Sequence, residues 1–267
     1  MVTIWHRVRK GVSGIGDTEW ALLLFETVGI VLGVLLAVQV GTWIEDRKEA
    51  REQRELVERL FEESQMAIPI IRGQIGFFER PKERQVEALD QLINRGSCPG
   101  RSGWGALANT QFFPPLNPPS TAYDEMVGAG GLGRLRDPQV RNAVSTFHGG
   151  LAQFTQQQEF FRSINVEEGA LFNDKFPLSF DPETAEVGIG DEGYDALCED
   201  DEIRMHMLSA FRSSHVLNSA REELMSAAIR MCVLLGDEVG RECVPTFGEP
   251  LTQEQIAAAR GQDRESE

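Results

Sequence analysis

Residues 27–44 read TVGIVLGVLLAVQVGTWI and contain no charged side chain. As a helix rising about 1.5 Å per residue, they would span about 27 Å, close to the thickness of the hydrocarbon core of a bilayer. Trp20 and Trp43 bracket the apolar stretch, and indole rings favour the membrane interface. The pattern predicts one transmembrane anchor over residues 20–44, with the lipid bilayer as its first partner.

A cleaved signal peptide is the main alternative for this stretch. Its apolar region would be shorter and would end in small residues at a cleavage site. Here Ala37-Val38-Gln39 is a poor match to such a site, and a charged segment follows Ile44 directly. The sequence therefore favours an uncleaved signal-anchor that tethers the rest of the chain.

Two features of the predicted anchor go beyond its hydrophobicity. Small residues recur at every fourth position, which would place them on one side of a helix and let a second helix approach closely. A carboxylate also stands at the start of the stretch, either as a costly intramembrane charge or as a group that reaches the lipid headgroups. The residues expected to carry helix association are Glu26, Gly29, Gly33, Ala37 and Gly41.

The net charge of −16 lies entirely beyond the predicted anchor. Residues 1–54 hold seven basic and seven acidic side chains, whereas residues 55–267 hold 19 basic and 35 acidic ones. Such a surface repels phosphate backbones, so we expect no nucleic-acid partner. The charged fraction of 25% is that of an ordinary folded domain rather than of a disordered chain.

Flanking charge does not decide on which side of the membrane residues 55–267 lie. Basic residues precede the predicted anchor in residues 6–10 and follow it in residues 47–54. Four widely spaced cysteines suit two disulfides in an oxidising compartment, or four reduced thiols that pack as small apolar side chains. These cysteines are Cys98, Cys198, Cys232 and Cys243, and no pair has the CxxC spacing of a zinc or redox site. Together with the acidic charge of residues 55–267, the cysteines favour an extracytoplasmic over a cytoplasmic domain.

Two further patterns accompany the apolar run. The first pattern consists of Glu26, Gly33, Ala37-x-Gln39 and Trp43-x-Glu45, followed by Arg47-Lys48-Glu49. The second consists of Thr121 and Tyr123-Asp124-Glu125-Met126, followed by a glycine-rich turn. In these residues the chain resembles a bacterial family of single-pass membrane proteins of unknown function, whose anchors have the form E…G…AxQ…WxE and lead into a charged helix. The resemblance implies a location in the bacterial inner (cell) membrane and brings no activity with it.

Helices are predicted directly after the anchor. Residues 45–55 are almost all charged, with opposite charges at helical spacing, and predict a solvated stalk that continues the anchor helix. Apolar faces at helical spacing then extend to residue 95, with Pro69 breaking or kinking the first helix and Pro81 as another interruption. Residues 97–119 predict a stiff loop because they contain two Pro-Pro pairs.

A short helix and a longer one are predicted next. Thr121 and Asp124 have the spacing of a capping box, and Asp137-Pro138 is a strong helix start signal. Apolar residues keep a 4-3 spacing from Val140 to Ile164, with Gln158 filling one slot. This spacing is typical of a bundle-packing face.

The longest soluble helix is predicted over residues 200–235, with Gly236 closing it. Its apolar residues keep the same 4-3 spacing, although Ser214 and Arg221 interrupt it. The acidic residues 166–199 predict irregular structure, and no segment shows the sustained two-residue alternation of a sheet.

These elements define a mainly α protein. One N-terminal transmembrane helix continues into a helical stalk and an irregular helical-bundle soluble domain. The expected divisions are a basic flank (1–19), the anchor (20–44), the stalk with the first amphipathic helices (45–95), a Pro/Gly-rich loop (96–119), the rest of the bundle (120–250), and a short helix with a polar tail (251–267).

The sequence offers no convincing catalytic, cofactor or metal motif. Residues 128–133 fit G-x-G-x-x-G, but the segment before them predicts a helix rather than the strand that a dinucleotide site requires. Residues 181–202 contain ten carboxylates without the ligand spacing of an EF-hand. The four histidines, which lack metal-ligand spacing, are His6, His148, His206 and His215.

We therefore expect that the protein is not an enzyme and that it binds no cofactor and no metal ion. The leading hypothesis is a membrane-anchored helical protein that acts by association, either as a homodimer or with another membrane protein. A sensory or small-ligand-binding extracytoplasmic module is the alternative, because helical bundles can bind small molecules between their helices. An enzyme of unrecognised type comes last.

Overall fold

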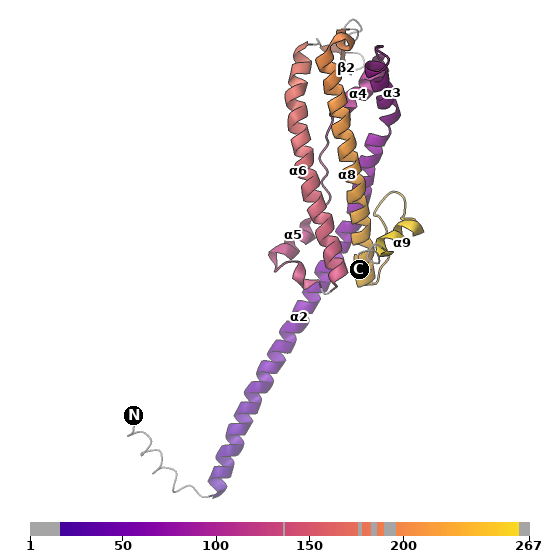
Figure 1. The fold of residues 1–267 in the computed structure, drawn as a ribbon. Coiled ribbons are helices and arrows are strands. Elements are labelled where there is room, and N and C mark those ends of the chain that lie inside the picture. The colour runs from indigo at the N-terminus through magenta and orange to yellow at the C-terminus, as the bar shows by residue number, and fades with distance from the viewer. Residues whose placement is uncertain (1–16, 136, 176–177, 183–185, 190–195, 262–267) are drawn as a thin grey trace, which may run out of the picture. The chain divides into compact units, whose positions relative to one another are not determined.

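The computed structural model describes residues 17–135, 137–175, 178–182, 186–189 and 196–261. The fold is mainly helical, as the sequence predicts (Figure 1). The chain divides into two compact units, Met1–Glu55 and Leu56–Glu267.

Helix α2 (Asp17–Glu79) contains the apolar stretch, the charged stalk and the first part of the bundle. It continues through Pro69, so of the predicted break or kink at this residue the break is wrong. Proline removes one backbone hydrogen bond, but Ile68 and Ile71 on either side of it are fully buried and hold the helix in the core. Pro81 lies between two helices as predicted, because α2 ends at Glu79 and α3 (Lys82–Ile93) begins directly after this proline.

The loop predicted over residues 97–119 is correct only in its second half. Its first half forms α4 (Arg101–Ala108) and a 3-10 turn, η2 (Asn109–Gln111). Burial of Trp104 and Leu107 stabilises α4 although two glycines weaken its helix propensity. One of them, Gly103, permits close packing, because a Cβ there would lie 2.8 Å from the Pro99 Cβ atom and 3.2 Å from that of Ala88.

Helix α5 (Thr121–Gly128) forms as predicted, but its capping box does not. The N-cap residue is Ser120, whose hydroxyl contacts the Asp124 carboxylate at 3.1 Å instead of a backbone N–H. A tertiary contact satisfies one free backbone donor of this helix: the Ala122 N–H donates to the Glu63 carboxylate of α2 at 2.8 Å. The 3-10 turn η3 (Leu132–Arg134) follows.

Helix α6 (Pro138–Lys175) begins where the Asp-Pro signal predicts. The Gln139 N–H donates to the Asp137 carboxylate at 2.7 Å, as an N-cap requires. The helix continues into the segment expected to be irregular, which also holds an antiparallel pair of strands, β1 (Leu178–Asp181) and β2 (Glu186–Ile189). Strands of four residues are too short to show a two-residue period in the sequence.

Helix α8 (Asp201–Val239) is capped by Asp200, whose carboxylate accepts from the Glu202 and Ile203 N–H groups. It ends at Gly240, which has the left-handed conformation with φ 71°, so the predicted closure at Gly236 is wrong. Helix α9 (Gln253–Gly261) confirms the short C-terminal helix, and Thr252 and Gln255 form a reciprocal capping box.

Helices α6 and α8 lie side by side and antiparallel (Figure 1). With the second half of α2 and with α5 they enclose the main core, in which Phe61, Phe147 and Leu217 are buried. A smaller core joins α3, α4 and the start of α8 around Leu92 and Trp104. Of the apolar residues in the predicted packing face of α6, Val140, Val144, Phe147 and Phe154 are buried, whereas Leu151, Phe161 and Ile164 are half-buried.

Candidate functional site

The apolar part of α2 is a surface without protein cover. Every described side chain from Glu26 to Ala50 is exposed, and the apolar stretch within this range is wholly unburied in its unit. Among the described residues, α2 is the one helix long and apolar enough to span a membrane. Insertion in a bilayer would remove such an apolar surface from water.

The small residues of this helix leave open space beside it. A Cβ atom at Gly29, Gly33 or Gly41 would meet no atom within 4 Å other than those of its chain neighbours and of the helix's own backbone. Ala37 and Glu26 are likewise exposed. The row expected to admit a second helix is therefore free on the surface of this unit.

Of the two tryptophans expected at the membrane interfaces, the structure describes the side chain of Trp43 only. Trp43 is exposed, and the Arg47 guanidinium lies 4.1 Å from the centre of its ring. A cation stacked on an indole is suited to a position among lipid headgroups. Trp20 lies within α2, and its side chain falls outside the described part of the chain.

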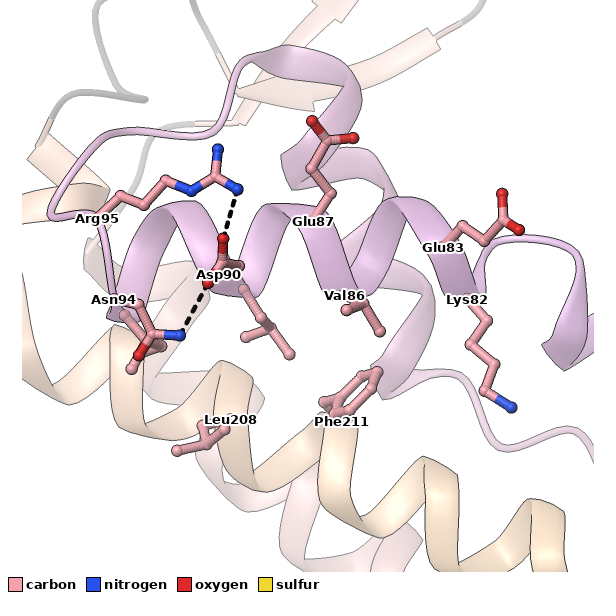
Figure 2. A pocket seen from close by; sticks show the side chains of 11 residues that line it. Lys82, Glu83, Val86, Glu87, Asp90, Asn94, Arg95, Leu208 and Phe211 are labelled. Atoms are coloured by element: carbon pink, nitrogen blue, oxygen red, sulfur yellow. Dashed lines mark hydrogen bonds and ion pairs between the residues drawn. The ribbon is translucent and has the colours of Figure 1, made fainter.

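A shallow groove of about 890 Å³ runs between α3 and α8 (Figure 2). Its apolar lining includes Val86 of α3 and Leu208 and Phe211 of α8. Charged and polar groups border it, and the Asp90 carboxylate accepts from Asn94 at 2.9 Å and pairs with Arg95 at 2.6 Å. Such an open apolar surface with a polar rim is suited to protein contact rather than to enclosure of a small molecule.

A disulfide joins the segment after α3 to the segment before α8, the two helices that line this groove. Cys98 follows the end of α3, Cys198 precedes the start of α8, and their Cα atoms are 5.5 Å apart. A second disulfide joins Cys232 in α8 to Cys243 in the segment after it. All four cysteines are thus paired, and of the two alternatives that the sequence leaves open the structure shows disulfides.

The proline-rich segment is held by side chains of two helices. Pro114 and Pro115 have no N–H to donate, so only their carbonyl oxygens can form backbone hydrogen bonds. Those carbonyls and that of Phe113 all accept from polar side chains of α2 and α6. The bonds are Gln74 Nε2 to Pro115 at 2.7 Å, Gln158 Nε2 to Pro114 at 2.6 Å and Arg162 Nη2 to Phe113 at 3.0 Å.

Arg221 lies in the same region and is completely buried. Its Nε donates to the Gln74 side-chain oxygen at 3.1 Å, and its guanidinium carbon lies 4.0 Å from the centre of the Phe78 ring. Its Nη1 and Nη2 atoms have no hydrogen-bond partner among the described residues. Burial lowers the pKa of this guanidinium to about 10, so it stays charged at neutral pH. The sequence showed this residue only as an interruption of the apolar spacing, and a charge at a core position was the available signal.

The other sequence candidates are the glycine motif, the acidic stretch and the histidines. The G-x-G-x-x-G stretch begins at the last residue of α5 and passes through a turn, in which Gly130 and Gly131 have positive φ, into η3. Part of the acidic stretch 181–202 and all of His6 lie outside the described residues. Among the residues that are described, no group of three or more His, Cys, Asp or Glu could hold a metal ion.

His148 of α6 is a buried, neutral side chain. Its ring stacks on that of Tyr123 with centroids 3.6 Å apart. Burial lowers its pKa to about 4, although the nearby Asp124 carboxylate acts in the opposite direction. The geometry assigns His148 a packing role between α5 and α6.

The low pKa of His148 predicts acid sensitivity. The unfolded chain binds a proton below its ordinary pKa of 6.5, whereas the folded chain does so only near 4. The free energy of unfolding therefore falls by roughly 3 kcal/mol as the pH drops through this window. His148→Phe is expected to remove this contribution in urea unfolding measured at a series of pH values. The exposed His215→Phe should keep the wild-type slope, and an unchanged slope in His148→Phe would contradict the assignment.

No family model, no curated protein and no solved structure matches this chain. The resemblance to a single-pass membrane family therefore stays a prediction.

Proposed function

We propose that this chain is a single-pass membrane protein with an extracytoplasmic helical domain, and that it acts by association through its membrane helix. The observation that carries the proposal is the uncovered apolar stretch of α2 with its open row at Gly29, Gly33, Ala37 and Gly41. Lipid tails are as apolar as leucine, so membrane helices associate chiefly through close packing and polar contacts. A row of small residues makes such packing possible.

The disulfides support the extracytoplasmic placement. Disulfides persist in secreted and periplasmic proteins and are rare in the cytosol, where thiols are kept reduced. Here both pairs of cysteines are joined, and each pair fastens a helix of the folded domain. The acidic surface of residues 55–267 is in keeping with a domain that stays free of anionic lipid headgroups.

Association is proposed to involve either a second copy of the chain or another membrane helix. Close approach at the small residues would bring backbones together, with Glu26 at one end of the row. The groove between α3 and α8 offers apolar surface on the domain as a further contact area.

Gly33→Ile is the variant that tests this proposal. A branched side chain in the row would keep the backbones apart, and we expect the association constant to fall by about tenfold. The measurement is energy transfer between labelled full-length chains in lipid vesicles, together with crosslinking in native membranes to detect a different partner.

Val31→Ile provides the matched control, because it adds bulk two residues away and hence on the other side of the helix. It should associate like the wild type. A chain that is strictly monomeric, and forms no crosslinked product that Gly33→Ile removes, would contradict the proposal.

A further inference from the structure

The buried guanidinium of Arg221 lacks the partners that such a group normally has. Arginine is almost never fully buried unless it is paired, because removal of a charge from water costs several kcal/mol. Arg221 is 0% exposed and forms one hydrogen bond, from Nε to Gln74. Its two Nη groups, which together carry four N–H donors, have no acceptor among the described residues.

The acidic side chains that contact the neighbouring residue Asn218 have other partners. Glu79 of α2 accepts from Asn218 at 2.8 Å and pairs with Lys82 at 3.0 Å. Glu222 of α8 lies 3.5 Å from the same Asn218 amide. Neither carboxylate forms an ion pair with Arg221, so the charge is not neutralised within the described part of the protein.

Asn218 supplies a second unpartnered group, one turn before Arg221 on α8. Its Nδ2 faces the Glu79 and Glu222 carboxylates, which can only accept hydrogen bonds, and this fixes the orientation of the amide. The amide oxygen therefore points elsewhere, and it is buried without a donor. Four free donors and one free acceptor thus come from two neighbouring residues of one helix.

Aromatic rings limit what can bind beside these groups. The guanidinium carbon lies 4.0 Å from the centre of the Phe78 ring and 5.2 Å from that of Phe154. The planar fork of arginine matches a carboxylate with two parallel hydrogen bonds. Apolar surroundings strengthen such a pair because they exclude water.

We propose that Arg221 and Asn218 form a binding site for a small organic carboxylate that also carries a hydroxyl or ammonium donor. The carboxylate pairs with the two Nη groups, and the donor of the ligand reaches the Asn218 oxygen. Solvent lies on the Asn218 side of the site, because Asn218 bonds to Glu79, and Glu79 and its partner Lys82 are 39% and 43% exposed. This site is independent of association through the membrane helix.

Thermal unfolding of the full chain in a neutral detergent tests the proposal, with glycolate as the probe. A ligand that binds only the folded state at 100 times its Kd raises the Tm of a domain of this size by about 5–10 °C. We expect such a rise with glycolate, a smaller one with acetate, which has no donor, and none with chloride at equal ionic strength. An equal rise with chloride would overturn the assignment.

Two arginine variants test whether the stabilisation by glycolate depends on Arg221. Arg221→Met keeps the volume of the side chain and is expected to abolish the glycolate response, while Arg212→Met removes an exposed arginine from the same helix and should retain it. A full response in Arg221→Met would overturn the proposal. If that variant does not fold, the ¹⁵N signal of the Arg221 Nε atom in the wild type decides: a shift that saturates with glycolate supports the site, and no shift overturns it.

Discussion

Gly236→Ala is expected to destabilise the domain by about 3 kcal/mol, because there is no room for a methyl group at this position. A Cβ atom there would lie 2.5 Å from the Arg241 carbonyl oxygen and 3.2 Å from the Phe61 ring. The carbonyl cannot move easily, since the Arg241 N–H donates to the Gly236 oxygen at 2.8 Å and Cys243 is tied to Cys232. Urea unfolding, read by far-ultraviolet circular dichroism, measures the loss.

Gly150→Ala is the matched control for this substitution. Gly150 also lies inside a long helix, but its added Cβ would make an ordinary contact of 3.5 Å with the Leu224 side chain. Alanine favours helix over glycine by about 1 kcal/mol, so this variant should be at least as stable as the wild type. If Gly236→Ala behaved in the same way, the close packing of α8 against the segment after it would be wrong.

Removal of the Cys98–Cys198 disulfide by a double change to serine should cost about 2–5 kcal/mol. The bond closes a loop with a sequence separation of 100 residues, for which chain entropy alone gives about 4.7 kcal/mol. It also fastens the small core of α3, α4 and the start of α8. We expect hydrogen exchange in α4 to accelerate more than exchange in the middle of α6.

The Cys232–Cys243 pair, with a separation of 11 residues, provides the comparison for this prediction. Its removal should also destabilise the domain, by about 3 kcal/mol on the same entropic account. The faster exchange should then appear at the end of α8 and leave α4 less affected. If both double variants changed exchange in the same places, the two disulfides would not stabilise separate regions.

Local signals in the sequence predicted the starts of α6 and α9 well. The Asp137-Pro138 start of α6 and the Thr252 start of α9 depend on contacts within a few residues, so the sequence is sufficient to place them. The end of α8 depends on tertiary packing instead. Gly236 resembles a helix stop, but the structure uses it for close approach to the Arg241 backbone, and Gly240 ends the helix.

Long-range contacts explain what the sequence did not reveal. Helix α4 is stabilised by the burial of Trp104 and Leu107 against α3, and no local sequence pattern predicts that contact. Arg221 was visible as a charge at a core position, whereas its unpartnered Nη groups follow only from how α2, α6 and α8 surround it. The pairing of four cysteines likewise requires the three-dimensional fold.

Protease protection tests the central proposal most directly, namely that α2 spans a membrane and residues 55–267 lie outside the cytoplasm. The full chain, with an epitope after Glu267, is expressed in bacteria, and intact spheroplasts are treated with protease while a cytoplasmic protein serves as the control. We predict that the chain remains with alkali-washed membranes, and that the epitope is digested while the cytoplasmic control survives. An epitope that stays protected until the membrane is lysed, or a chain recovered in the soluble fraction, would contradict the account.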